Sequence, residues 1–150
     1  MKIQCSKLNL NKRTRNIRDF ISASRCLGYS WGKGEGKVIE AWADDLWRIK
    51  KYNGILVAKV SGKIVGALSY YFCGKPQRKL DYAEVDYIHV DKSYRNMGVG
   101  TSLMKHFEKV CRSAKSIKSI GLESINCTEY FYESLGYKKS RGGFTKRIRK

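Results

Sequence analysis

The stretch YRNMGVGTSL, residues 94–103, combines an arginine with two glycines in a spacing that suits phosphate binding. Arg95 lies three positions before Gly98, and Gly100 follows after one further residue. An aliphatic segment precedes the stretch and an amphipathic segment follows it. Glycine lets the backbone approach a ligand closely, and a helix N-terminus favours an anion, to which arginine adds a full positive charge. The pattern therefore indicates a phosphate-binding turn between a strand and a helix.

Two common nucleotide-binding motifs do not fit the glycines of this chain. A dinucleotide fingerprint requires a third glycine at the position that Leu103 occupies. The stretch GKGEGKV, residues 32–38, looks like a P-loop, but Trp31 stands where that motif needs its first glycine and Val38 where it needs serine or threonine. We interpret residues 32–37 as a mobile loop between two helices, on the substrate side.

Size and composition indicate a single folded domain spanning residues 1–150. Hydrophobic residues make up 42% of the chain, which is enough to build a core. No apolar run is long enough to cross a bilayer, and the first residues lack the apolar region of a secretory signal, so we expect a cytoplasmic protein without a membrane partner. The five cysteines show no C-x-x-C spacing, and His89 and His106 lack metal-ligand spacing, so we expect reduced thiols and no metal.

The chain is strongly basic. It carries 31 lysines and arginines against 13 acidic residues, for a net charge of +18, and residues 1–18 and 138–150 contain no acidic residue. Such a balance favours a polyanionic partner, which could be nucleic acid, an acidic protein or a phosphorylated cofactor. A merely solvated basic surface explains the charge equally well, because aromatic residues do not alternate with the basic ones as they do on a base-stacking surface.

Hydrophobic periodicity predicts an order of strands and helices typical of a mixed α/β fold. We expect strands at 2–9, 54–60, 64–72, 80–90, 118–124, 137–140 and 144–148, and helices at 14–27, 38–51, 98–115 and 127–136. This order predicts one central, mixed and twisted sheet of six to seven strands with helices on both faces.

The glycine stretch in this setting resembles the GNAT superfamily of acetyl-CoA-dependent N-acetyltransferases, whose phosphate loop reads Q/R-x-x-G-x-G/A. The segment FYESLGY, residues 131–137, is similar to the end of that family's last helix. The element order over residues 54–148 fits as well. The resemblance implies a GNAT-like fold, acetyl-CoA as cofactor with coenzyme A as product, and transfer of the acetyl group to a primary amine.

The resemblance also implies which residues hold the cofactor. Arg95 and the backbone amides that follow it should bind the pyrophosphate of coenzyme A, at Asn96, Met97, Gly98, Val99, Gly100 and Thr101. The main chain of the preceding strand should pair with the pantetheine arm and polarise the thioester carbonyl, at Ile88, His89 and Val90. Asn126 resembles a cofactor-contacting asparagine of the family, but it stands one residue closer to the tyrosine of FYESLGY than is usual, and a helix N-cap is its alternative role.

The same resemblance suggests the catalytic groups. Tyr132 corresponds to a tyrosine that acts as general acid toward the departing thiolate, although it could instead pack in the core. Glu84 corresponds to a strand glutamate that serves some members as general base, and Asp86, two residues on, or water could take the amine proton in its place. By strict alternation along the strand, His89 should point away from Glu84.

These features predict an N-acetyltransferase that uses direct transfer in a ternary complex, because no cysteine stands at an evident nucleophile position. The charge of +18 repels cationic acceptors such as polyamines, and a protein amine is therefore the favoured acceptor. The alternative is a binding module of the same fold that holds nucleic acid or acetyl-CoA with little or no turnover. The sequence leaves open whether the protein is a monomer or a homodimer.

Overall fold

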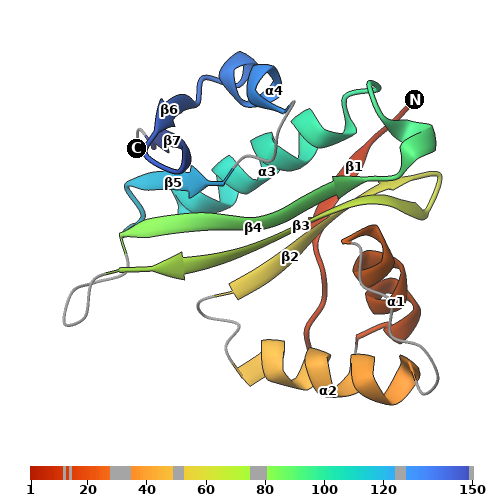
Figure 1. Cartoon of the computed structure of the whole chain (residues 1–150). Coiled ribbons are helices and arrows are strands. Elements are labelled where there is room, and N and C mark those ends of the chain that lie inside the picture. Colours follow the sequence, from red (N-terminus) through yellow and green to blue (C-terminus); the bar gives the residue numbers. More distant parts are fainter. Residues whose placement is uncertain are drawn as a thin grey trace.

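The computed structural model describes residues 1–11, 13, 15–27, 35–48, 53–74, 81–123 and 128–148. Seven strands form one sheet in the order β1-β2-β3-β4-β5-β7-β6 (Figure 1). Strands β4 and β5 pair in parallel, and all other neighbours in the sheet are antiparallel. Helices α1 and α2 lie on one face, and α3 and α4 lie on the other (Figure 1). The predicted fold class, a mixed sheet with helices on both faces, is confirmed.

The strands and helices that periodicity predicts are present, with bounds that differ by a few residues. The strands are β1 Gln4–Lys7, β2 Asn53–Val60, β3 Lys63–Cys73, β4 Tyr82–Val90, β5 Ser119–Leu122, β6 Lys138–Ser140 and β7 Gly143–Arg147. The helices are α1 Ile17–Cys26, α2 Glu35–Arg48, α3 Val99–Ser113 and α4 Glu129–Ser134. A short 3-10 turn that the periodicity does not indicate, η1 Lys92–Tyr94, links β4 to α3. Among the described residues, no helix has both the length and the apolar character that crossing a membrane requires.

Each face of the sheet carries its own core. On the face of α3 and α4, residues such as Val85 and Phe107 belong to one buried cluster. On the face of α1 and α2, Ala23 and Ile55 belong to a second one. Because both faces are covered, the central strands β2 and β3 are apolar at consecutive positions instead of alternating with polar residues.

Helix α3 lies very close to the sheet at its first turn. A Cβ atom at Gly66 of β3 would stand 3.0 Å from Cγ1 of Val99 and 3.1 Å from Cδ1 of Leu103, so a larger residue would push these side chains away by a few tenths of an ångström. Val99 and Leu103 are themselves almost fully buried. The close packing fixes the N-terminus of α3 beside the end of β4.

The interpretation of residues 32–37 as a loop is wrong for its second half, because α2 already begins at Glu35. Residues 32–34 lie outside the part of the chain that the structure describes.

Candidate active site

Strands β4 and β5 separate part-way along the sheet. They pair from Tyr82 with Ser119 to Val85 with Leu122, and β4 then continues alone on that side to Val90 (Figure 1). Within the described residues, positions 87–90 keep strand pairing only with β3. The other side of β4 is therefore an open strand edge, which can pair with an extended ligand.

A bulge in β4 stands where the strands part. Ser69 of β3 pairs with Tyr87, but the next residue of β3, Tyr70, pairs with Val85, which leaves Asp86 as an extra residue. A single extra residue reverses the side-chain alternation of a strand. Accordingly, Ala83 and Val85 before the bulge and Ile88 and Val90 after it all belong to or pack against the α3-side core.

The bulge corrects one expectation about β4. Strict alternation puts Glu84 and His89 on opposite faces, and this is wrong, because the reversal brings His89 to the face that Glu84 occupies. The exposed side chain of His89 thus lies on the α1–α2 side of the sheet. The carboxylate of Asp86, at the bulge itself, is partly desolvated, and burial raises its pKa.

The main-chain groups of Ile88 and Val90 face the open edge. The amide of Asp91 donates to the carbonyl of Val65 at 2.8 Å, so the N–H groups at alternate positions from Asp91, including that of His89, are directed toward β3. The intervening residues, Ile88 and Val90, face the other way. In agreement, the Val90 carbonyl accepts from Nε of Arg95 at 3.1 Å.

The glycine stretch forms an uncapped helix start. Gly98 is the N-cap of α3 at φ +83°, and no side chain caps the helix there. The first bond of the helix joins the amide of Ser102 to the carbonyl of Gly98 at 2.9 Å, so the amides of residues 99–101 have no acceptor within the helix. Asn96 also adopts a left-handed conformation, at φ +60°, which asparagine tolerates better than most residues.

The chemistry of this helix start fits an anionic cofactor. Arg95, Asn96, Met97 and Gly98 are exposed, and Lys92 in η1 adds a second exposed cation. Unused amides, the positive end of α3 and these two cations together favour a diphosphate group. Because Val90 ends the open edge of β4 and Arg95 bonds to it, the anion site and the strand edge are continuous.

Helix α4 brings the tyrosine of FYESLGY to the same region. A Cβ atom at Gly100 would stand 3.3 Å from Cζ of Phe131 and 3.8 Å from Cγ2 of Val90, so α4, the first turn of α3 and the end of β4 meet at one point. The neighbouring Tyr132 is 6% exposed. Its ring lies 5.1 Å from that of Phe131 and 5.8 Å from that of Phe144. Burial raises the pKa of the Tyr132 phenol, which therefore stays protonated at neutral pH.

The Tyr132 side chain is thus at once a core residue and a neighbour of the candidate site. It belongs to the buried cluster that also contains Val85 and Leu122, the last residues that β4 and β5 pair. Among the described residues, no protein group forms a hydrogen bond with its hydroxyl.

On the other face of the sheet, close to the point where β4 and β5 separate, lies the carboxylate of Glu84. Glu84 lies between Tyr71 of β3 and Gly121 of β5, and its carboxylate accepts from the hydroxyl of Tyr82. Burial, and then this hydrogen bond, raise the pKa of Tyr82. Burial, and then the charge of Glu84, raise the pKa of Tyr71. Both phenols remain neutral near the carboxylate and can donate hydrogen bonds to it or to a ligand.

Tyr82 is a site residue that the sequence patterns did not predict, although its two-residue spacing from Glu84 puts both side chains on one face of the strand. The phenol needs the space above Gly121, because a Cβ atom there would overlap the Tyr82 hydroxyl. Among the other residues considered, Asn126 lies outside the described part of the chain, and His106 is half-buried on α3.

The described thiols do not favour nucleophilic chemistry. Burial raises the pKa of Cys5 and of Cys26, and at Cys73 the charges of Glu84 and Asp81 add to burial in raising the thiol pKa. Cys111, on the buried face of α3, is fully buried. A thiol with a raised pKa holds little thiolate at neutral pH, and the thiolate is the reactive form.

Comparison with known proteins agrees with this geometry. The profile of the acetyltransferase (GNAT) family matches residues 19–137. Glucosamine-6-phosphate N-acetyltransferase from Arabidopsis thaliana superposes with a TM-score of 0.75 at 16% identity, over 93% of this chain and 94% of that one. An acetyltransferase from Trypanosoma brucei gives a TM-score of 0.73 at 24% identity, over 93% and 94%.

The PaiA N-acetyltransferase from Thermoplasma acidophilum, solved with coenzyme A, gives a TM-score of 0.64 at 18% identity over the full length of both chains. At such identities the solved structures show a common fold, and the profile match over most of the sequence shows the family. The predicted resemblance is therefore confirmed: this chain is a member of the acetyltransferase (GNAT) family.

Proposed function

We propose that the protein transfers an acetyl group from acetyl-CoA to a primary amine, directly and within a ternary complex. The observation that carries this proposal is the open edge of β4, which leads without interruption into the uncapped start of α3. An extended pantetheine arm fits the strand edge, and a pyrophosphate fits the amides beyond it.

We propose a counterpart in the chain for each part of the cofactor. We assign the pyrophosphate to Arg95 and the amides of residues 96–101. The pantetheine arm would pair with Ile88 and Val90, whose main-chain groups face the open edge, whereas the N–H group of His89 is directed toward β3. An amide of this edge would also polarise the thioester carbonyl. The role of Asn126 stays a prediction from the resemblance.

Arg95→Ala should weaken acetyl-CoA binding by about 10- to 100-fold, because a charge-assisted contact with the pyrophosphate is lost. Calorimetric titration of both proteins measures this. Lys105→Ala is the control, since it removes an exposed cation of α3 that lies beyond the uncapped amides, and its effect should be about threefold or less. Equal losses of acetyl-CoA affinity in the two variants would mean that Arg95 contributes only its general positive charge.

Proton transfer completes the reaction. The attacking amine must lose a proton and the departing thiolate must gain one. We assign the donation of the proton to the thiolate to Tyr132, because burial keeps its phenol protonated. Glu84 would take the amine proton, directly or through water, and Asp86 is the alternative base. Since the raised pKa values of the described thiols disfavour a thiolate nucleophile, we assign no acetyl-cysteine step.

Glu84→Gln should lower the rate most at low pH, where the acceptor amine is protonated and needs a base, and the rate should recover partly as pH rises. A pH–rate profile of the variant against the wild type measures this effect. Glu123→Gln provides the control, because it removes a nearby exposed carboxylate of the same charge. Glu123 lies just beyond the residues that β4 and β5 pair. A Glu84→Gln profile that parallels the wild type would move the base to Asp86 or to water.

The acceptor amine is the second substrate of this reaction. A protein amine remains our candidate, because the overall charge of +18 disfavours small polycations in solution. The decisive experiment is a panel of lysine peptides, free amino-termini, polyamines and amino sugars incubated with labelled acetyl-CoA. Failure to bind coenzyme A would overturn the proposal, and binding without transfer to any amine would favour the alternative of a module without turnover.

A further inference from the structure

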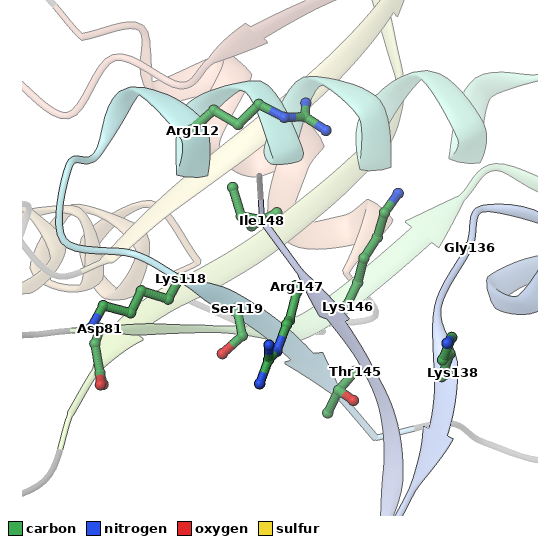
Figure 2. A pocket seen from close by; sticks show the side chains of 10 residues that line it. All are labelled: Asp81, Arg112, Lys118, Ser119, Gly136, Lys138, Thr145, Lys146, Arg147 and Ile148. Carbon is green, nitrogen blue, oxygen red and sulfur yellow. The ribbon is translucent and has the colours of Figure 1, made fainter. Parts of the chain in front are cut away.

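A broad hollow opens at the end of the sheet away from the glycine stretch. It measures about 1180 Å³, and it is lined by Asp81, Arg112, Lys118, Ser119, Gly136, Lys138, Thr145, Lys146, Arg147 and Ile148 (Figure 2). The lining comes from the C-terminal end of α3, the start of β5, the start of β6 and the end of β7. These segments are far apart in the sequence, so the hollow exists only in the folded chain.

The hollow is positively charged. Five of its side chains are basic, and they face two carboxylates, Asp81 in the lining and Glu108 behind it. An excess of three positive charges remains. Nζ of Lys146 lies 2.8 Å from Oε1 of Glu108, and Nη2 of Arg112 lies 3.2 Å from Oε2 of the same residue, so these two cations form a fixed inner wall.

The other three cations are exposed. Lys118, Lys138 and Arg147 make no ion pair with any residue that the structure describes. The hydroxyl groups of Ser119 and Thr145 lie among them as further hydrogen-bond donors. Lys146 and Arg147, neighbours on β7, point to opposite sides of the strand, so positive charge lines more than one wall (Figure 2).

This hollow is separate from the candidate active site. Arg112 lies near the last turn of α3, whereas the uncapped amides lie at the first turn of that helix. The 15 residues of α3 span roughly 20 Å. A ligand in the hollow therefore leaves the strand edge and the helix start free.

We propose that the hollow binds the sugar–phosphate backbone of a nucleic-acid duplex. Its lining contains no aromatic side chain, so it offers phosphates charge and hydrogen bonds but offers bases nothing to stack on. Its volume of about 1180 Å³ exceeds what one phosphate needs. A duplex presents a regular row of negative charges to cations on several strands. The net charge of +18 adds long-range attraction to the same partner. Binding is independent of base sequence, since only backbone groups are contacted.

The test compares two triple variants with the same loss of charge. The site variant replaces the exposed cations of the hollow by glutamine: Lys118→Gln, Lys138→Gln and Arg147→Gln. The control variant replaces exposed cations elsewhere on the chain: Lys2→Gln, Arg18→Gln and Lys105→Gln. Fluorescence anisotropy with a random-sequence DNA duplex, across a series of salt concentrations, gives the affinity and its salt dependence.

The site variant should bind the duplex at least about tenfold more weakly than the control variant, and the slope of log K against log[salt] should be smaller by about 2 to 3. Both variants should keep the melting temperature and the acetyl-CoA affinity of the wild type. Equal weakening in both variants would overturn the proposal, since the attraction would then be diffuse. A wild type without duplex binding at physiological salt would overturn it as well. Tighter binding of polyglutamate than of the duplex would show an acidic protein to be the partner.

Discussion

Tyr132→Phe should lower the turnover number by about 100-fold while leaving the acetyl-CoA affinity within about twofold of the wild type. The substitution keeps the ring that packs against Phe131, Tyr137 and Phe144, and it removes only the hydroxyl. Without that proton the thiolate must leave unassisted. Steady-state kinetics and calorimetry on the same preparation separate the two effects.

The neighbouring tyrosine supplies the control. Tyr130 is 84% exposed on the same helix, and Tyr130→Phe should behave like the wild type. The pH dependence gives a second readout, because burial raises the pKa of Tyr132 and the wild-type rate should hold up to alkaline pH before the phenol ionises. Wild-type turnover in Tyr132→Phe would show that the buried phenol serves packing alone.

Glu108→Ala should lower the free energy of unfolding by about 3 kcal/mol. The Glu108 side chain is 6% exposed and holds both Lys146 and Arg112. Removing one partner of a buried ion pair normally costs about 3–5 kcal/mol, because the other charge stays buried without a counter-charge. The lower end applies here, because Lys146 also donates to the Leu135 carbonyl at 2.6 Å and Arg112 is about half exposed. Urea unfolding measures the difference.

Glu129→Ala is the matched control for that measurement. Glu129 pairs with Lys139 at 3.6 Å, and both side chains are more than half exposed. Exposed pairs contribute about 0–1 kcal/mol, so this variant should unfold almost like the wild type. Similar losses in the two variants would mean that Glu108 lies in a more hydrated setting than its burial indicates.

Local patterns were enough to predict the order of the elements. The spacing of Leu103 and Phe107 on α3, for example, depends only on the helix repeat. The glycine stretch was equally readable, because a positive φ at Gly98 is a property of the turn itself. Both features depend on residues that are neighbours in the chain.

Features that depend on partner strands were not predictable in the same way. The bulge at Asp86 is set by how β4 pairs with β3, and nothing in the sequence around Asp86 distinguishes it from a regular strand position. The bond between Tyr82 and Glu84 requires Gly121 on β5. The basic hollow joins residues from Asp81 to Ile148, so only the total charge, and not its location, could be read from the sequence.

The bulge in β4 also determines what kinds of sequence change this strand tolerates. Replacing Asp86 by another residue keeps the extra position, and the side chains of Ile88 and Val90 stay on the core side. Deleting one residue there would turn both side chains to the opposite face and redirect the open main-chain groups toward β3. As far as the fold is concerned, position 86 can therefore vary in identity, but the number of residues between Val85 and Arg95 should stay fixed.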